Sequence, residues 1–411
     1  MLKLGGVATP MLIKINRQEL NSEHLSCIVG GNELTATPLR PYDERICSFL
    51  AELSQRLQKY RAYPDVVTFA FWCRKANIMN LKARFNEENI RIGRGIVFHV
   101  TPSNVPINFA FSFAFGLLSG NCNVVRIPTK EFPQINIVCS AINELLKEKQ
   151  YSDFNNRVMF LKYERNEEIT RFLSAHCDVR IIWGGDTAIQ QIRSYPIPER
   201  SIEIMFADRY SMAIIDFDAV GSLSENEMNK LAENFYNDTY LMDQNACSSP
   251  QLIIWQGKRK EKFEEKFWKS VYRVAEQKYI LEPVHAVDKF TNLCDTAINY
   301  DEIKKVRRYG NHVYCIELDR LPKCTESLRG KFGMFYEYYS DTIQELTPIV
   351  TKKYQTLSYF GVKKEDLVSW VIENGLQGID RIVPIGKAME MDLIWDGYDI
   401  LCNLSRIIDV K

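Results

Sequence analysis

The sequence lacks closely spaced residues that would bind a metal or form a disulfide framework. Its 411 residues include eleven cysteines and five histidines, but no CxxC and no HxxxH pair. Zinc and iron–sulfur sites usually rely on such pairs, so we expect no metal. The first 15 residues also lack the continuous apolar core of a secretion signal, because Gly5, Gly6 and Pro10 interrupt them. We therefore expect reduced thiols and a cytoplasmic protein.

The sequence also lacks an excess of either charge. Lys and Arg number 52, Asp and Glu number 52, and the formal net charge is zero. Nucleic-acid binding usually leaves a basic excess, so we expect no nucleic-acid partner. With 46% apolar and 25% charged residues, the composition is that of an ordinary globular protein, and the length fits two or three domains.

Charged residues are absent from one long stretch, residues 96–125, which resembles a membrane span. Prolines and asparagines interrupt it at six positions: Pro102, Asn104, Pro106, Asn108, Asn121 and Asn123. A single lipid-facing helix would accommodate all six only at a high cost, so we expect no integral membrane segment. The stretch instead predicts a buried strand, a buried helix and a second buried strand, at 95–100, 106–119 and 123–127.

The alternation of strand and helix continues along the chain. It predicts helices over 132–147, 167–175 and 187–194, and strands over 158–161, 179–183, 202–206 and 212–215. Strands and helices at this spacing indicate an α/β fold with a doubly wound, mostly parallel sheet. Such sheets bind ligands at the carboxyl ends of their strands. The spacing of strands and helices changes near residue 220, where a second domain is expected to begin.

Two glycines are the first candidate site. Gly184 and Gly185 follow a predicted buried strand and precede a predicted helix. Glycines at this place let the backbone approach a ligand, and the helix N-terminus offers N–H groups to an anion. No GxGxxG motif occurs in the sequence, and a tight structural turn explains two glycines equally well.

Cys247 is the second candidate. It lies in a polar turn of small residues, DQNACSS (243–249), ahead of an apolar strand. A thiol in such a loop can be accessible, and local N–H groups can favour its thiolate. A structural thiol is the alternative, and no histidine adjoins Cys247 in the sequence. Asn104, in TPSNVP, is the third candidate. It could cap a helix or present its amide to an oxyanion.

Together these segments resemble a known family. They occur in the order HVTPSNVPINFAF (99–111), LLSGNCNVVRIP (117–128), IIWGGDTAIQ (181–190) and DQNACSSPQ (243–251), followed by KYQTLSYFG (353–361), GIDRIVPIG (378–386) and WDGYDILCNLSRIIDV (395–410). This order resembles the aldehyde dehydrogenase superfamily. More narrowly, it is similar to the LuxC-type acyl-CoA and acyl-protein reductases, which reduce fatty acyl thioesters to aldehydes. The resemblance covers roughly residues 90 to 410.

The resemblance implies a role for each candidate. Cys247 stands at the position of the family's nucleophile, and Asn104 at that of the superfamily's oxyanion-hole asparagine. The family's cofactor-binding positions correspond to six residues: Thr101, Pro102, Arg126, Thr129, Gly184 and Gly185. Arg126 replaces a common lysine near the adenosine ribose, and Thr129 replaces a glutamate frequent in members that prefer NAD. A basic residue without a nearby carboxylate tolerates a 2′-phosphate, so NADPH is expected over NADH.

The resemblance also implies the reaction and the partners. We expect an acyl group to pass from acyl-CoA or an acylated protein to Cys247, and hydride to release a fatty aldehyde. An acyl-protein synthetase is a possible partner, and a homo-oligomer is expected. Aldehyde-oxidising members activate water with a glutamate, for which Glu203 is the candidate here. Its offset matches that pattern poorly, and a role at a strand edge is the alternative.

Four regions follow from this resemblance: a mostly helical N-terminal region (1–90), a Rossmann-like NADP-binding domain (91–218), a catalytic domain (219–368) and a C-terminal segment returning to the cofactor domain (369–411). Two other functions share the same fold. One is an aldehyde dehydrogenase that produces free acid, and the other is a catalytically silent acyl-binding subunit.

Overall fold

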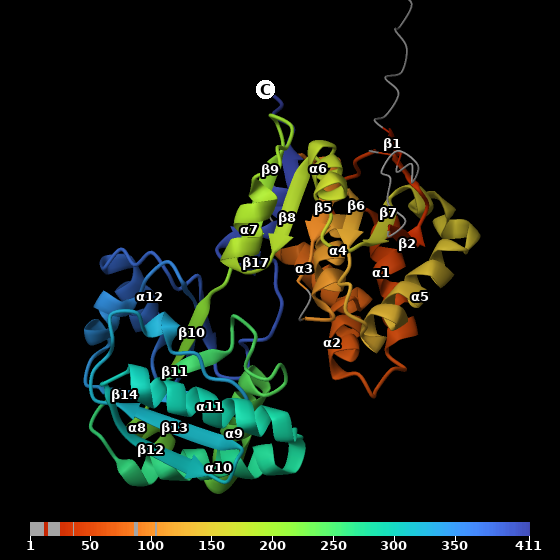
Figure 1. Ribbon diagram of the computed structural model, residues 1–411. Helices are drawn as coiled ribbons and strands as arrows, with labels where there is room; N and C mark the ends of the chain where they lie inside the picture. The colour runs from red at the N-terminus through yellow and green to blue at the C-terminus, as the bar shows by residue number, and fades with distance from the viewer. Residues whose placement is uncertain (1–11, 15–24, 36, 86–88, 103–104) are drawn as a thin grey trace, which may run out of the picture. The chain divides into compact units, whose positions relative to one another are not determined.

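The computed structural model describes residues 12–14, 25–35, 37–85, 89–102 and 105–411. The chain forms two compact units (Figure 1). The described residues up to Ala207, together with Tyr398–Lys411, form the first unit. The second unit comprises Asp208–Gly397.

The first unit contains a six-stranded sheet in the order β2-β7-β6-β5-β8-β9. Its strands are β2 (Ser26–Gly30), β5 (Ile96–Val100), β6 (Cys122–Arg126), β7 (Val158–Lys162), β8 (Val179–Trp183) and β9 (Ile202–Phe206). All neighbours are parallel except β2 and β7. From β5 the chain adds β6 and β7 on one side, then β8 and β9 on the other. The predicted doubly wound sheet is therefore confirmed, and its strand order reverses between β5 and β8.

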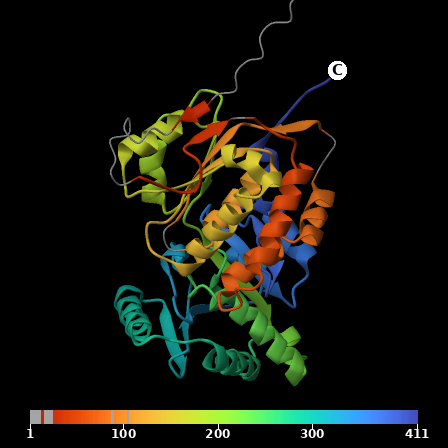
Figure 2. The same cartoon turned by 90° about the vertical axis from the view of Figure 1, so that its right-hand side faces the viewer.

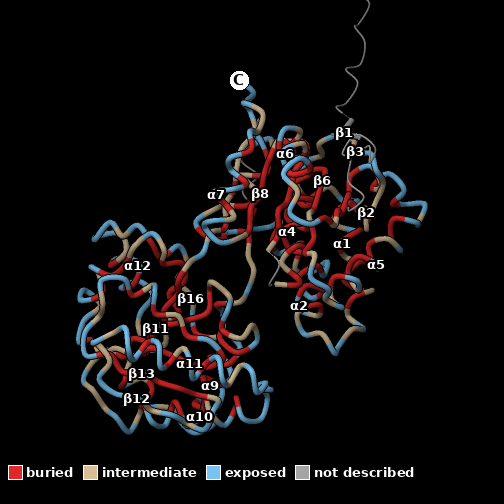
Figure 3. Tube along the Cα trace, in the orientation of Figure 1, coloured by how far each residue is buried: buried red, intermediate tan, exposed pale blue. Residues whose placement is uncertain are grey.

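The helices of the first unit pack against this sheet or against one another. They are α1 (Glu44–Leu57), α2 (Pro64–Trp72), α3 (Lys75–Arg84), α4 (Asn108–Leu118), α5 (Pro133–Leu146), η1 (Lys149–Asn156), α6 (Glu167–Ala175), α7 (Asp186–Arg193) and α13 (Ile400–Leu404). Strands β5 and β8 are buried along their whole length, as Figure 3 shows. The helix α1 packs against α2 and α5 (Figure 2). Continuous apolar runs thus form strands that are covered on both faces.

The uncharged stretch at 96–125 forms β5, α4 and β6, as predicted. Every residue of α4 from Phe109 onward is buried. Phe113 packs edge-on against Phe160 of β7, and Phe111 packs against Phe69 of α2. The helix is apolar all round because it lies between the sheet and another helix. In the part of the chain that the structure describes, no helix has an apolar run long enough to cross a membrane.

A buried histidine ties α4 to three strands. His99 on β5 lies 2.7 Å from the Ser112 hydroxyl through Nδ1 and 2.9 Å from the Asn123 amide oxygen through Nε2. The Trp183 indole donates to the same Ser112 hydroxyl at 3.0 Å. Burial lowers the pKa of His99 to about 4, so the ring is neutral near pH 7. These bonds hold α4 in register with β5, β6 and β8.

The second unit contains a seven-stranded sheet in the order β12-β13-β14-β11-β10-β15-β16. Its strands are β10 (Tyr210–Asp216), β11 (Pro250–Gln256), β12 (Ile303–Tyr309), β13 (Val313–Leu318), β14 (Met334–Ser340), β15 (Tyr354–Phe360) and β16 (Arg381–Pro384). Its helices are α8 (Phe217–Gly221), α9 (Glu225–Thr239), α10 (Glu261–Lys278), α11 (Pro283–Asn299), η2 (Thr325–Ser327), η3 (Ile343–Ile349) and α12 (Lys364–Glu373). Only β12 runs antiparallel to its neighbour among these described strands.

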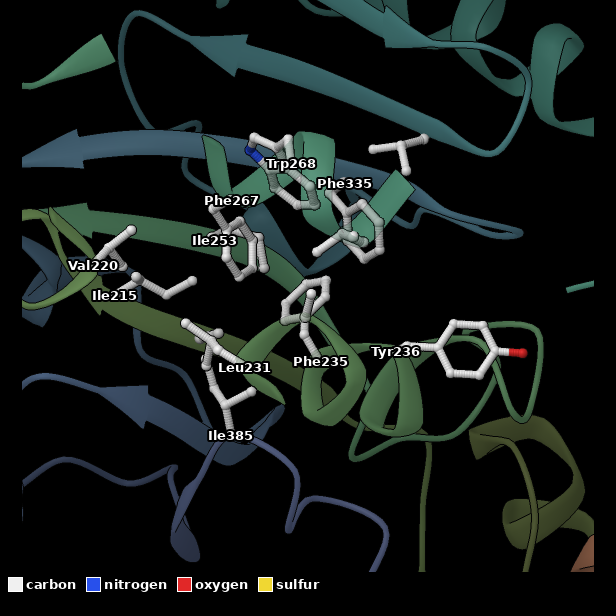
Figure 4. Packing of buried hydrophobic residues seen from close by; sticks show 14 of the residues in the cluster. Ile215, Val220, Leu231, Phe235, Tyr236, Ile253, Phe267, Trp268, Phe335 and Ile385 are labelled. Carbon is white, nitrogen blue, oxygen red and sulfur yellow. The ribbon is translucent and has the colours of Figure 1, made fainter. Parts of the chain in front are cut away.

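Alternate residues of these strands bury opposite faces of the sheet. Ile253 packs with Phe235, Phe267 and Phe335 on the face covered by α8, α9 and α10 (Figure 4). Ile254, the next residue, belongs to the cluster on the other face, against α11 and α12. The aromatic rings interlock edge-on, with 5.3 Å between the centroids of Phe235 and Phe267. This core fixes α9 and β11, the two elements that flank Cys247.

Short strands complete the fold. They are β1 (Leu12–Lys14), β3 (Glu33–Thr35), β4 (Arg91–Gly93), β17 (Ile394–Trp395), β18 (Tyr398–Asp399) and β19 (Ser405–Ile407). The strand β19 pairs antiparallel with β4, and Arg91 donates to the Cys402 carbonyl at 3.1 Å. The last residues of the chain are therefore part of the first unit.

Candidate active site

Predicted cofactor residues meet at one edge of the first unit's sheet. Thr101 and Pro102 follow β5, Arg126 ends β6, and Gly184 and Gly185 follow β8. The Thr101 hydroxyl donates to the Arg126 carbonyl at 2.7 Å and joins two of these strand ends. Because β6, β5 and β8 are parallel neighbours, all five residues lie at their carboxyl ends, beside the reversal of strand order. Thr129 follows three residues after Arg126. Ligands of open α/β sheets bind at this place.

The two glycines leave open space at the start of α7. A Cβ added to Gly185 would meet no atom within 4 Å, and one added to Gly184 would meet only the Ala188 methyl, at an ordinary 3.6 Å. Gly185 caps α7 with a φ of −71°, which any residue can adopt. Neither packing nor backbone conformation therefore requires glycine here. The space is suited to an anionic group at the helix N-terminus.

No carboxylate among the described residues neutralises the charge of Arg126. Its guanidinium lies over the Tyr163 ring, 4.7 Å from the centroid, and its side chain is partly exposed. Among the described residues, Arg126 forms no ion pair. A cation held flat on an aromatic ring at the end of β6 is available to an incoming phosphate.

Glu203 forms ion pairs with two arginines. It lies opposite Arg180 in the register of β8 and β9, and Arg180 Nε donates to its Oε1 at 2.8 Å. Arg193 Nε donates to Oε2 at 3.3 Å. Both carboxylate oxygens of Glu203 are therefore engaged. Glu203 is the second residue of β9, near the amino end of that strand. In this geometry the Glu203 carboxylate joins β9 to Arg180 of β8.

Cys247 lies in a tight turn between α9 and β11. Asp243 and Gln244, four and three residues before it, have φ angles of 53° and 62°, in the left-handed region that residues other than glycine rarely adopt. The Gln244 side chain donates to the Met334 carbonyl at 2.9 Å and accepts from the Gly333 N–H at 3.2 Å. Such strain persists only where surrounding bonds enforce it, and it is concentrated at functional sites.

The backbone of Cys247 is bonded to β10. Its carbonyl accepts a hydrogen bond of 2.6 Å from the Ser211 hydroxyl on β10. The same hydroxyl accepts the N–H of Thr356 on β15 at 3.1 Å. Cys247 itself is partly exposed, and it forms no disulfide. The turn thus presents a thiol whose backbone is tied to Ser211 of β10, and β15 in turn holds the Ser211 hydroxyl.

Burial raises the pKa of the Cys247 thiol above its usual value of 9.0. The carboxylates of Asp396 and Asp208 raise this pKa further, whereas the N–H of Arg209 and the charge of Arg329 lower it. A local N–H thus favours the thiolate, but burial outweighs it. The thiol is therefore the predominant form near pH 7.

The sequence-based reasoning missed the residues that hold Cys247. Ser211 and Gln251 are polar side chains at buried positions of otherwise apolar strands, and this was a signal that could have found them. Gln251 donates to the Gln244 carbonyl at 2.9 Å. Arg329 gave no such signal, because it lies about eighty residues away in a loop. Asn104, the predicted oxyanion residue, lies outside the described residues.

The described residues contain no group of three or more His, Cys, Asp or Glu side chains that could hold a metal ion.

Comparison with known proteins then identifies the family. The sequence profile of the family described as acyl-CoA reductase (LuxC) matches residues 32–281, more than half of the 411. The chain belongs to this family.

Curated relatives agree with the assignment to the LuxC family. A long-chain acyl-protein thioester reductase from Photorhabdus laumondii is 23% identical over 323 residues, which cover 77% of this chain and 63% of the relative. A protein of the same name from Aliivibrio fischeri is 23% identical over 305 residues, covering 70% and 60%. The chain thus matches less than two thirds of the length of these relatives.

Solved structures similar to this LuxC-family chain include aldehyde dehydrogenases. An NAD-dependent benzaldehyde dehydrogenase from Corynebacterium glutamicum aligns with a TM-score of 0.63 and 11% identity, covering 94% of each chain. A 1-pyrroline-5-carboxylate dehydrogenase mutant from Thermus thermophilus aligns with a TM-score of 0.59 and 13% identity, covering 90% and 81%. The predicted aldehyde-dehydrogenase-like fold is confirmed.

Proposed function

We propose that this chain reduces a fatty acyl thioester to the fatty aldehyde with NADPH, through an acyl group carried on Cys247. The observation that carries the proposal is the clamped, strained turn that presents Cys247 in a chain of the LuxC family. The donor is acyl-CoA or an acylated partner protein, and the latter is supported by the names of the curated relatives. An acyl-protein synthetase would supply such a donor, and we expect the chain to form a homo-oligomer.

In the first step, Cys247 loses its proton and its sulfur attacks the thioester carbonyl carbon. Collapse of the tetrahedral intermediate expels the carrier thiolate, which takes up a proton, and one thioester replaces another at little cost. We assign Asn104, with the Cys247 N–H, to the oxyanion. The hydrogen bond from Ser211 to the Cys247 carbonyl keeps the sulfur in place during the exchange.

Six residues would hold the cofactor: Thr101, Pro102, Arg126, Thr129, Gly184 and Gly185. The open space at Gly185 and the unneutralised Arg126 fit a dinucleotide with an additional phosphate, which favours NADPH. When bound, the cofactor supplies the hydride that releases the aldehyde. Glu203 is engaged by Arg180, so it is not assigned to the activation of water. This favours reduction over the alternative of hydrolysis to free acid.

The test is a reaction of the purified chain with long-chain acyl-CoA and NADPH. We expect one aldehyde for each NADPH consumed, and an acyl adduct on Cys247 when NADPH is omitted. An acylated carrier protein offered in place of acyl-CoA distinguishes the two donors. Acid formation from aldehyde and NAD(P)⁺, without reduction of thioester, would contradict the proposal.

The cofactor assignment predicts a specific effect at Gly185. The Gly185→Val variant should fold normally, because a Cβ there meets no protein atom. It should raise the KM for NADPH about tenfold or more, since the side chain fills the space left for the pyrophosphate. Steady-state kinetics at varied NADPH would measure this. Gly184→Ala, whose methyl has only an ordinary contact with Ala188, is the milder control, and an unchanged KM in Gly185→Val would contradict the assignment.

A further inference from the structure

Arg329 is a rigidly held cation in the loop between η2 and β14. Its Nη1 donates to the Arg209 carbonyl at 2.8 Å and its Nη2 to the Asp208 carboxylate at 3.0 Å. Its Nε donates to the Glu326 carbonyl at 2.9 Å. All three nitrogens are therefore engaged, and the guanidinium lies over the Tyr210 ring, 5.3 Å from its centroid. Such a fork keeps both position and charge fixed.

The segment that Arg329 holds continues to Ser211, whose hydroxyl donates to the Cys247 carbonyl at 2.6 Å. In the same segment, a hydrogen bond from the backbone N–H of Arg209 lowers the pKa of the Cys247 thiol and so favours the thiolate. The Arg209 side chain is anchored separately, because it donates to the Tyr354 carbonyl at 2.8 Å and pairs with Asp380. Arg329 fixes the carbonyl of the same residue. Residue 209 is thus held from two sides, two residues before the serine that binds the Cys247 carbonyl.

Two carboxylates and one guanidinium act in opposite directions on the Cys247 thiol. The carboxylates of Asp208 and Asp396 both disfavour a thiolate, and Asp396 is buried. Arg329 is a cation that favours it. Loss of the Arg329 charge would leave two carboxylates acting on the sulfur with less opposition. Loss of the Asp208 charge would leave Arg329 without its ion-pair partner and have the reverse effect.

We propose that Arg329 is a positioning residue for Cys247, because its guanidinium fixes the Asp208–Arg209 backbone beside the sulfur and offsets the neighbouring carboxylates. It acts through other groups and is not assigned to contact the substrate. This inference rests on the proposed role of Cys247 as the nucleophile. Its test, however, requires neither an acyl donor nor a cofactor.

The experiment measures the rate at which iodoacetamide alkylates Cys247 in the full chain between pH 7 and pH 10.5. Digestion and mass spectrometry assign the modified peptide, and Cys247→Ser supplies the blank. In Arg329→Met we expect alkylation about tenfold slower at pH 8, with the pH profile displaced to higher pH, as for a pKa raised by about one unit. In Asp208→Ala we expect faster alkylation and a profile displaced to lower pH.

The two variants form a matched pair, because each removes the same hydrogen bond between Arg329 and Asp208. A merely structural role would shift both in the same direction, whereas the proposal requires opposite shifts. Arg329→Lys retains the charge without the fork and should fall between the wild type and Arg329→Met. Shifts in the same direction, or rates within twofold of the wild type in Arg329→Met and Asp208→Ala, would overturn the proposal.

Circular dichroism and thermal melts establish that each variant is folded. If Arg329→Met does not fold, Arg329→Lys and Asp208→Ala still test the proposal. Arg329→Lys must slow the alkylation of Cys247, and Asp208→Ala must accelerate it. Aldehyde formation is measured in parallel on the wild type. Absence of aldehyde together with opposite alkylation shifts would reject the proposed function and retain the positioning role. Aldehyde formation without opposite alkylation shifts would retain the proposed function and reject the positioning role of Arg329.

Discussion

Replacing Cys247 with serine is expected to lower kcat/KM for acyl thioester reduction by about 10⁴-fold or more. A serine hydroxyl fits the same turn, but it is a far weaker nucleophile than a thiolate, and loss of a nucleophile commonly removes almost all covalent catalysis. Because Ser211 binds the Cys247 carbonyl and not its side chain, the variant should keep its fold and its affinity for NADPH. NADPH absorbance and aldehyde analysis measure the loss.

Cys294→Ser is the matched control for this experiment. Cys294 is an exposed thiol on α11, outside the Cys247 turn, and its loss should leave the rate unchanged. Intact-mass measurement after incubation with acyl-CoA alone should show one acyl group on the wild type and on Cys294→Ser, and none on Cys247→Ser. Retention of the acyl group by Cys247→Ser would place the nucleophile elsewhere.

Local patterns in the sequence predicted the helices and strands of the first unit from β5 to β9, apart from η1. The charge-free stretch became β5, α4 and β6, with α4 starting at Asn108, two residues after the predicted start at Pro106. The glycine pair at 184–185 lies between β8 and α7 as expected. These features depend on residues close in the chain, whose apolar periodicity and turn chemistry can be read directly.

Contacts between distant segments could not be predicted in this way. Cys247 depends on Ser211 and Thr356, each more than thirty residues away along the chain. Its thiol also responds to Arg329, which belongs to a loop before another strand. The sequence pattern identified the cysteine, but not the groups that set its reactivity. Parallel strands bring such groups together through long crossovers, and one sequence does not specify which strands become neighbours.

Replacing Glu203 is expected to have the second large effect, which is on the stability of the fold and not on catalysis. Arg180 is almost fully buried, and Glu203 is the carboxylate that pairs with it. Glu203→Gln should therefore lower the free energy of unfolding by about 2–4 kcal/mol, because a buried guanidinium loses its counter-charge but retains bonds to Ser174 and Tyr195. Urea denaturation at neutral pH measures this loss.

Arg193→Ala is the control that distinguishes the buried ion pair of Glu203 with Arg180 from its exposed ion pair with Arg193. Arg193 is 55% exposed and contacts the other oxygen of the same carboxylate, so its loss should cost less than about 1 kcal/mol. Neither variant should change the turnover of the folded enzyme by more than about twofold. A general base at Glu203 requires the opposite result, in which Glu203→Gln keeps its stability and loses turnover. Because the two roles move stability and turnover separately, a single variant decides whether this carboxylate supports the sheet or takes part in the reaction.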